Sequence, residues 1–385
     1  MKNTSVNTTL LLVYLLLLYF GSTLLIPGLL ESYAFKAVYV VFGICLSFFY
    51  YSQLPSNSRN KVGHLILIAV FLLLLNLFFT QSKYFHILNL FSIVSFYAVL
   101  PYTSIDGKRL TKTLLVFFFA MALFNVGKII GATLATEEEG YASFFQSANG
   151  MGPCVYAMLL CIVYLYYNRG SRSSKLKYFV LFGITLFILY TTHCRSILLA
   201  LVLWILGIYV LRKKRINEKL FFVIYIIGIF AIGALMVYAE VIQGEDSLFS
   251  IEMFGKGTSS RGRAGMIYMA FEKYSVNLLG YGNGVATGYV ADMTGYTIHN
   301  MYVSTLLDYG LLITLFYLYF VYICYKRCDS VILKSYLLSI QMFFFFEPFC
   351  AFDSKIMMVI LYVCILQNSM NNSYSKKPQL ITATA

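Results

Sequence analysis

Charged residues are scarce in this chain. They make up 12% of its 385 residues, whereas hydrophobic residues make up 60%. Soluble globular chains carry roughly twice that charged fraction. Apolar runs of about 17 to 25 residues recur from end to end, and each is long enough to cross a hydrocarbon core of roughly 30 Å. The composition leaves little material for a soluble domain and predicts an all-α, polytopic membrane protein.

Patterns typical of metal sites and disulfide frameworks are also lacking. The eight cysteines lie mostly inside apolar runs, where cysteine packs as a small hydrophobic residue. There is no HExxH motif, and the acidic run Glu137–Glu139 is more typical of a solvated loop than of a divalent-ion site. No A-x-A-like cleavage site follows the first apolar run, so we interpret that run as an uncleaved span. We expect neither a metal nor a cofactor.

The net charge of +13 does not indicate nucleic acid as a partner. The Lys and Arg residues gather in short gaps between apolar runs, and such charges hold loops on the cytoplasmic side of a membrane. This distribution favours topology anchoring and contact with membrane lipids. We expect twelve helices in a single integral domain of residues 1–385, with spans near 9–30, 34–51, 62–80, 84–101, 110–134, 148–168, 178–193, 195–211, 219–240, 300–322, 333–350 and 356–370.

The seventh and eighth spans come from one apolar run, Tyr178 to Val210, which is interrupted only by "TTHCRS". A single helix of that length would measure about 50 Å, too long for one crossing. Both flanks, "NRGSRSSKLK" and "RKKRINEK", are strongly basic and favour the cytoplasm. The run is therefore predicted to be a hairpin with Arg195 at its outer tip.

Charge counting supports a topology with both termini in the cytoplasm. Twenty of the 29 basic residues then fall in cytoplasmic segments, against three of the 16 acidic residues. Two outward segments stand out, Ala135 to Gly150 and the much longer loop 241–299 between the ninth and tenth spans. Loops that long in a compact architecture are usually functional.

Arginines on the outer side run against the positive-inside trend. Arg195 lies between apolar helices, where a charge is costly unless it reaches water, a partner or a ligand. Its partner is either an outer carboxylate or the phosphates of a ligand; the outer carboxylates are Glu137, Glu138, Glu139, Asp308 and Glu347. In the long loop, "SSRGR" places Arg261 and Arg263 before a helical stretch, where guanidinium groups can hold phosphate oxygens. Solvated arginines or lipid head-group contacts are the simpler interpretation.

Three of the four histidines, His86, His193 and His299, fall at the outer boundary. A histidine at the start of a helix is often only an interfacial side chain, and Asn300 would serve as an ordinary N-cap. An imidazole that titrates near neutral pH can also take a proton from a hydroxyl. Beside arginines that hold phosphate, His299 suggests transfer chemistry on a lipid-linked phosphorylated substrate.

The order of these motifs resembles the O-antigen ligase and polymerase superfamily, which includes the Wzy-type polymerases of O-antigen, capsule and exopolysaccharide. The resemblance covers most of the chain. It rests on "QSANGMG" with Asn149, the "CRS" arginine in a short hairpin, a large outer loop with "SSRGR" and "NLLGYGNG", and "HNMYVSTLLDYGLL". Tyr268, Leu278 and Ile313 depart from residues common in the family, at packing positions. Whether Arg261 or Arg263 matches the family arginine is left open.

The resemblance implies a polysaccharide polymerase in the bacterial cytoplasmic membrane with its active site on the outer face. A hydroxyl of the acceptor repeat unit attacks the anomeric carbon of the donor, and undecaprenyl diphosphate leaves. Arg195 and Arg263 or Arg261 would hold the diphosphate, and His299 would act as base or orienter. Asn300 and Tyr302 would position sugars, and His193 and Asn149 would contribute to substrate binding. The flippase and the chain-length regulator of the same pathway are possible partners.

Three alternatives remain. A ligase of the same superfamily would pass a finished chain to a different acceptor. A flippase or transporter of lipid-linked sugars should show charges at the membrane midplane, broken helices and an internal repeat, whereas Lys128 is the main charge within a span and the two halves differ in loop length. A structural scaffold of an assembly complex leaves the outer arginines and His299 without a role.

Overall fold

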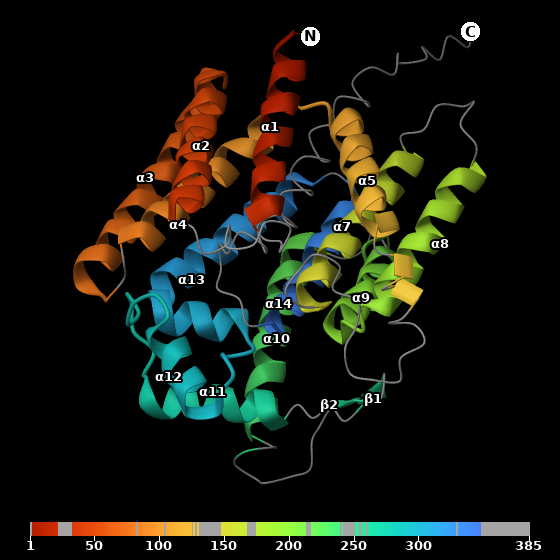
Figure 1. The fold of residues 1–385 in the computed structure, drawn as a ribbon. Helices are drawn as coiled ribbons and strands as arrows, with labels where there is room; N and C mark the ends of the chain where they lie inside the picture. Colours follow the sequence, from red (N-terminus) through yellow and green to blue (C-terminus); the bar gives the residue numbers. More distant parts are fainter. Residues whose placement is uncertain are drawn as a thin grey trace, which may run out of the picture.

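The computed structural model describes residues 2–21, 33–81, 84–103, 105–124, 126–127, 129–130, 148–167, 175–212, 217–238, 241, 251–253, 256–258, 261–328 and 330–347. This part of the chain is almost entirely helical (Figure 1). Its α-helices are α1 (Lys2–Gly21), α2 (Tyr33–Ser52), α3 (Ser56–Phe79), α4 (Tyr84–Val99), α5 (Gly107–Phe124), α7 (Ala148–Tyr167), α8 (Lys175–Thr191), α9 (Arg195–Arg212), α10 (Glu218–Val237), α11 (Arg261–Lys273), α12 (Val285–Thr294), α13 (Met301–Arg327) and α14 (Val331–Phe345). A 3₁₀ turn spans Leu100–Tyr102, and a short antiparallel hairpin joins β1 (Ile251–Met253) to β2 (Lys256–Thr258).

Several of these helices have the length and composition of membrane spans. Five described helices are long and apolar enough to cross a membrane, and they lie at Ala34–Ser52, Ser56–Phe79, Arg195–Arg212, Glu218–Val237 and Met301–Arg327. Shorter apolar helices accompany them at Ser5–Leu17, Ile87–Tyr102, Met151–Tyr167 and Val331–Phe345. The chain is therefore a multi-pass membrane protein. The first eleven expected spans each overlap a helix, and the twelfth, 356–370, lies outside the described residues.

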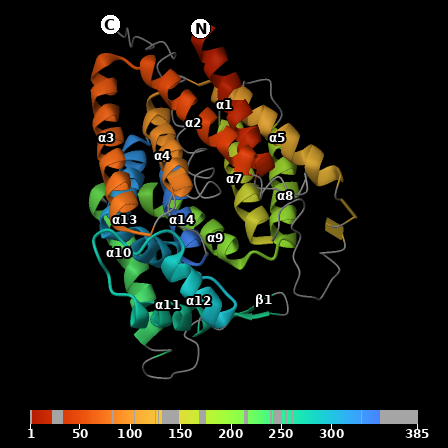
Figure 2. The same ribbon diagram turned by 60° about the vertical axis from the view of Figure 1, so that its left-hand side comes forward.

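The predicted hairpin between the seventh and eighth spans is confirmed. Helices α8 and α9 are joined by only three residues, 192–194, and His193 there has a left-handed φ of 52°. A turn this tight reverses the chain after α8 and places Arg195 at the first position of α9. In Figure 1 this turn lies toward the end of the bundle that carries α11 and α12, which we call the α11–α12 end. Figure 2 shows the same arrangement after a rotation of 60°.

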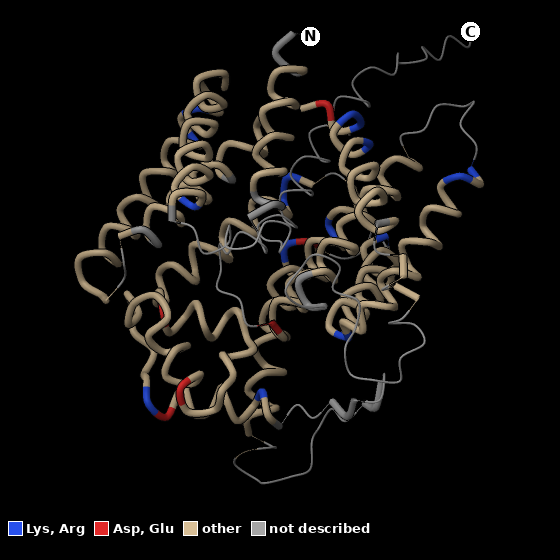
Figure 3. Tube along the Cα trace, in the orientation of Figure 1, with Lys and Arg blue, Asp and Glu red and all other residues tan. Residues whose placement is uncertain are grey.

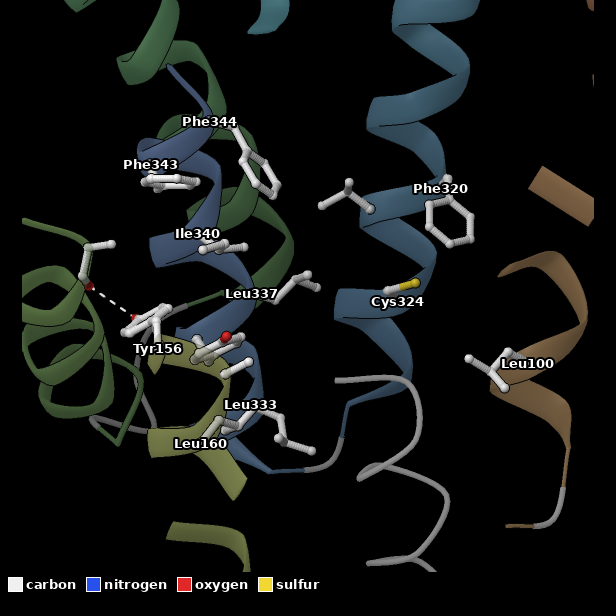
Figure 4. Close-up of a cluster of buried hydrophobic side chains, with 14 of the residues drawn as sticks. Leu100, Tyr156, Leu160, Phe320, Cys324, Leu333, Leu337, Ile340, Phe343 and Phe344 are labelled. Atoms are coloured by element: carbon white, nitrogen blue, oxygen red, sulfur yellow. Dashed lines mark hydrogen bonds between the residues drawn. The ribbon is translucent and has the colours of Figure 1, made fainter. Parts of the chain in front are cut away.

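The core of the bundle is built around α14, which packs most extensively on α9. Gly207 of α9 permits the close approach, because a Cβ there would lie 2.3 Å from the Ser335 hydroxyl. Small residues commonly bring membrane helices together in this way. Tyr156 of α7 is fully buried beside α9 and α14 (Figure 4). Its hydroxyl donates to the Ala200 carbonyl (3.2 Å) and shares a hydrogen bond with Ser339 (2.6 Å).

Two basic side chains at the other end of the bundle are paired or stacked. The Lys334 ammonium pairs with Glu218 at the start of α10, and the Arg327 guanidinium lies 3.7 Å from the centroid of the Tyr102 ring. In Figure 3, most Lys and Arg positions of the described residues lie in the half of the molecule that holds the N-terminus. This asymmetry matches the basic segments that the sequence places between spans.

The segment between α11 and α12 interlocks with a break in α13. Gly310 has φ 88° and ψ 173° in the middle of α13, so the helix loses its regular hydrogen bonds there. The incoming segment replaces them: Leu311 N–H donates to the Asn277 carbonyl, and Tyr281 N–H donates to the Leu307 carbonyl. A side chain at Gly310 would meet the Gly280 backbone at 2.4 Å. Gly280 of "NLLGYGNG" and Gly310 of "LLDYGLL" therefore meet where the segment before α12 packs into the break in α13. We call this contact the joint.

A buried carboxylate completes this joint. Asp308 is fully buried and accepts hydrogen bonds from the backbone N–H groups of Gly284, Ala286 and Thr287, and from the Thr287 hydroxyl. These donors form the start of α12, which has no side-chain cap of its own. Asp308 therefore supplies the acceptor that the first turn of a helix requires. The joint fixes α11 and α12 against α13, and this positions the residues described next.

Candidate active site

Arg263 lies at the centre of a group of polar side chains at the α11–α12 end. It occupies the first turn of α11 and is partly buried; the helix begins at Arg261, whereas the sequence placed Arg261 and Arg263 just before the helical stretch. Its guanidinium carbon lies 5.5 Å from the centroid of the Phe346 ring, which follows α14. The charge of Arg263 influences the pKa values of His299, Glu347 and Cys194, so these four residues share one electrostatic environment.

His299 lies two residues before α13 and faces this environment in its neutral form. Burial, together with the positive charge of Arg263, lowers the pKa of His299 to about 4. Its Nδ1 atom is buried and has no hydrogen-bond partner among the described residues. A neutral imidazole with an open nitrogen can accept a hydrogen bond or a proton from a ligand. Asn300 holds the next position by capping α13, with its side chain accepting from Val303 N–H at 3.0 Å.

Glu347 brings a buried carboxyl group to the same place from the end of α14. It is 1% exposed, and its Oε1 atom accepts a hydrogen bond from the Ser196 hydroxyl at 2.5 Å. Its Oε2 atom has no hydrogen-bond partner in the described part of the chain. Burial raises the pKa of Glu347 to about 7, against the opposing effects of Ser196 and Arg263. A carboxyl group with a pKa near neutrality is a candidate acid or base.

Arg195 lies beside this group, between Cys194 and Ser196 at the start of α9. It is partly buried, and the hydrogen bond of its neighbour Ser196 to Glu347 ties the turn to the end of α14. Burial raises the pKa of the Cys194 thiol to about 12, so that thiol is not a nucleophile at neutral pH. The ring of His193 packs edge-on against Tyr190, with centroids 6.5 Å apart.

Three other site residues predicted from the sequence are Tyr302, Asn149 and Arg261. Tyr302 is 1% exposed, and its hydroxyl donates to the Gln341 side chain at 2.9 Å inside the bundle, so we assign it a packing role. Asn149 lies in the first turn of α7 and Arg261 is the first residue of α11, and the side chains of both lie outside the described residues. Lys128 and Glu137–Glu139 also lie outside them.

Glu347 is the residue whose importance the sequence shows least. The sequence marks it only as one of several outer carboxylates, at the end of the phenylalanine-rich stretch "MFFFFEPF". Its signal is a single acidic residue next to a long apolar run, where an ionisable group is expensive unless it has a function. Its contact with Ser196 joins residues 151 positions apart and depends on the packing of α9 against α14.

These side chains can bind an anion and, beside it, accept or donate a proton. Arg263 supplies positive charge, His299 supplies an open acceptor, and Glu347 supplies a carboxyl group that titrates near pH 7. Among the residues that the structure describes, no group of three His, Cys, Asp or Glu side chains is arranged to hold a metal ion.

Comparison with known families gives a match to part of the chain. Residues 179–318 match a family model described as O-antigen ligase, and this stretch includes Arg195, Arg263 and His299. No curated protein matches the chain. Members of the matched family are membrane enzymes that transfer glycans, and lipid-linked polysaccharides are their substrates. Residues 179–318 thus match the O-antigen ligase family, which supports the resemblance of the chain to the O-antigen ligase and polymerase superfamily.

Proposed function

We propose that this protein is a polysaccharide polymerase that works at the outer face of the bacterial cytoplasmic membrane. It transfers a growing glycan from undecaprenyl diphosphate onto an incoming lipid-linked repeat unit. The observation that carries the proposal is the convergence of Arg263, His299 and Glu347 from three separate segments at one end of the bundle. The match of residues 179–318 to the O-antigen ligase family supports the reaction class.

The orientation in the membrane follows from charge. We propose twelve crossings in one integral domain of residues 1–385, with both termini in the cytoplasm and the loop 241–299 outside. The basic segments between spans support this orientation. The α11–α12 end then faces outward, where lipid-linked repeat units are polymerised. A cysteine placed at exposed Thr297 should react with an impermeant maleimide added to intact cells, and one at exposed Ser56 should not.

Arg263 and Arg195 are proposed to hold the diphosphate of the donor. A guanidinium group grips phosphate oxygens with parallel hydrogen bonds. Diphosphate is already a good leaving group, so its departure needs stabilisation of negative charge more than protonation. Preorganised cations aimed at the developing charge lower such a barrier. Arg263 is well placed because His299 is neutral near pH 7, and because Glu347, with a pKa of about 7, is only about half ionised there.

His299 is proposed to accept the proton of the acceptor hydroxyl. The hydroxyl oxygen forms a bond to the anomeric carbon, and the bond from that carbon to the diphosphate oxygen breaks with its electron pair. The proton passes to the imidazole, and the diphosphate leaves with its charge held by the arginines. The pKa of about 4 belongs to the site without substrate. A bound diphosphate raises it, because a nearby negative charge favours the imidazolium form.

Glu347 is proposed to act in its protonated form. An ionised carboxylate would repel the diphosphate that Arg263 binds, whereas a protonated one donates a hydrogen bond to it. The anionic substrate moves the pKa of Glu347 further above its value of about 7, so the group stays protonated while substrate is bound. Ser196 orients this carboxyl group through the 2.5 Å hydrogen bond. Asn149, His193 and Asn300 remain proposed contributors to substrate binding, and Arg261 a second candidate for the diphosphate.

A ligase is the second candidate, because the matched family model is described as O-antigen ligase. The two differ in the acceptor, which is another lipid-linked repeat unit for a polymerase and a different molecule for a ligase. Purified protein given only undecaprenyl-diphosphate-linked repeat units should form longer lipid-linked chains. If it forms none until a second type of acceptor is supplied, the ligase is correct. The flippase and chain-length regulator of the pathway are proposed partners.

The test in cells uses Arg195→Ala, Arg263→Ala and His299→Ala variants at normal membrane levels. We expect single repeat units on the lipid carrier and no long chains at the surface. Lys273→Ala is the matched control, since Lys273 is an exposed cation on the same helix as Arg263. Full-length polymer in all three variants would refute the catalytic assignment, and repeat units accumulating on the inner leaflet would favour a flippase.

A further inference from the structure

Asn76 is a buried amide near the end of α3, a helix with the length and composition of a membrane span. Its side chain is 0% exposed. A polar group inside a span is costly unless it is hydrogen-bonded, so its partners indicate what it does. The amide nitrogen of Asn76 donates to the Leu279 carbonyl at 2.7 Å and to the Tyr309 carbonyl at 3.5 Å. Both carbonyls belong to the joint, 203 and 233 positions further along the chain.

The end of α3 supports the joint from the side of the N-terminal helices. Two N–H groups of α13 donate to the carbonyls just before Leu279, and the Leu279 carbonyl accepts from Asn76. Gln81, just beyond α3, donates its N–H to the Tyr281 carbonyl at 3.3 Å. The approach is close, because a Cβ at Gly282 would lie 2.8 Å from the Gln81 backbone. Figures 1 and 2 both show this end of α3 beside the segment that leads into α12.

The joint carries a small hydrophobic cluster that is distinct from the main core. This cluster consists of residues of α11, α12 and the start of α13, namely Ile267, Ala270, Ala286, Val290, Ile298, Val303 and Leu307. It joins α11, α12 and the part of α13 before Gly310 into one unit. Arg263 and His299 belong to this unit, whereas Glu347 and Ser196 belong to the main bundle. The candidate site therefore lies between two packing units.

The part of α13 before the break can act as a lever. From Met301 to Tyr309 it is about 13 Å long. A tilt of about 5° at Gly310 would therefore move its start, next to His299, by about 1 Å. A displacement of about 1 Å in a catalytic site can cost roughly 100-fold in rate. Because the helix is interrupted at Gly310, contacts at the joint have to fix this tilt.

We propose that Asn76 is a positioning residue for the transfer reaction: by holding the joint, it sets where Arg263 and His299 lie relative to Glu347. This rests on the proposed function for the reaction that the site performs. Asn76 acts from α3, which lies outside the matched residues 179–318. The N-terminal helices thereby contribute to the geometry of a site whose arginines and histidine lie in another part of the chain.

The first measurement separates positioning from stability. Asn76→Leu has a similar branched shape and removes the amide donor. In proteoliposomes supplied with lipid-linked repeat units, its kcat/KM per folded molecule should fall roughly 10- to 100-fold. Asn76→Gln, which keeps an amide, should retain more of the activity. The matched control is Ser92→Ala, which removes another buried hydrogen bond of the N-terminal helices, to the Val40 carbonyl at 3.0 Å. Its kcat/KM should stay within about twofold of wild type, because Ser92 does not contact the joint.

The second measurement does not depend on turnover. The imidazole of His299 is titrated by NMR in histidine-labelled protein in nanodiscs, and because the chain has only four histidines, His299→Gln assigns the signal. The wild-type pKa should be about 4, since the ring is buried near Arg263. In Asn76→Leu, water should reach the ring and Arg263 should influence it less, so the pKa should rise toward the ordinary value of about 6.5. Ser92→Ala should leave it at about 4.

An unchanged His299 pKa or an unchanged kcat/KM in Asn76→Leu would overturn the proposal. Equal losses in Asn76→Leu and Ser92→Ala would overturn it too, since they would reflect stability alone. If Asn76→Leu does not reach the membrane, Asn76→Ser takes its place with the same predictions, because a serine hydroxyl can donate to a carbonyl of its own helix. If the His299 pKa shifts as expected but His299→Ala still makes full-length polymer, the proposed function fails and the positioning by Asn76 stands.

Discussion

Two buried carboxylates near the α11–α12 end, Asp308 and Glu347, have different surroundings. Asp308 accepts hydrogen bonds from three backbone N–H groups and one hydroxyl at the start of α12. Glu347 accepts one from Ser196, and its second oxygen has no hydrogen-bond partner in the described structure. A buried carboxylate whose oxygens are occupied by backbone donors stabilises a fold. One that keeps an oxygen open next to an arginine is available to a substrate.

Of substitutions at these two carboxylates, we expect Glu347→Ala to lower the activity most. Loss of a positioned donor in a preorganised site should lower kcat/KM by roughly 100-fold. The thermal midpoint of the purified protein should change little, because a single hydrogen bond is lost and a carboxyl group that is costly to bury is removed with it. Turnover of lipid-linked repeat units and a thermal melt in detergent measure the two quantities. A large fall in the midpoint with full activity per folded molecule would make Glu347 structural.

Asp308→Ala should have the opposite pattern. Backbone donors of Gly284 and Ala286 would lose their acceptor, and a buried donor without a partner costs about 1–3 kcal/mol. We expect about 2 kcal/mol lower stability and less protein in the membrane. The activity of the molecules that remain folded should fall less than in Glu347→Ala. An unchanged melting midpoint would show that Asp308 does not hold α12.

The pH dependence of activity should follow the protonation of His299 and of Glu347. In the free enzyme, kcat/KM should fall as pH drops through about 4, where His299 becomes protonated and cannot accept a proton. It should also fall as pH rises through about 7, where Glu347 loses its proton and its negative charge opposes the diphosphate. The decline above pH 7 should be about tenfold per pH unit. In Glu347→Gln, which stays neutral, that decline should disappear; its persistence would assign the upper limb to another group.

The smallest effect concerns Tyr302, which the sequence nominates as a sugar contact. Tyr302→Phe removes the hydrogen bond to Gln341 within the bundle and should cost about 1 kcal/mol of stability. Because its hydroxyl is directed into the bundle, KM for repeat units should stay within about twofold of wild type. A much larger rise in KM without loss of stability would restore Tyr302 as a substrate contact.

The sequence predicts local structure here better than it predicts contacts between distant segments. The hairpin at Arg195 and the cap at Asn300 follow from charge, spacing and capping, which are properties of neighbouring residues. The joint between Gly280 and Gly310 could not be predicted in this way. The expected span 300–322 reads as one uninterrupted helix, and the break depends on hydrogen bonds from residues 277 to 281.

The candidate site shows the same division. Arg263 and His299 were predicted from their position in an outer loop, but their common partner Glu347 belongs to a different end of the chain and meets them only through helix packing. Tyr302 shows the limit of a motif, since position in a sequence does not say whether a side chain at the start of a helix faces the bundle or the solvent. The side chain of Tyr302 packs against Phe230, with ring centroids 5.1 Å apart.

The account depends most on the charge of Arg263, and a comparison of two cations on α11 tests it directly. In proteoliposomes supplied with lipid-linked repeat units, kcat/KM of Arg263→Ala should fall at least 100-fold, the scale expected when a preorganised group that stabilises developing charge is lost. Lys273→Ala should stay within about twofold of wild type, because Lys273 is exposed and lies over the Tyr289 ring. Equal activity of the two variants would contradict the assignment of this site.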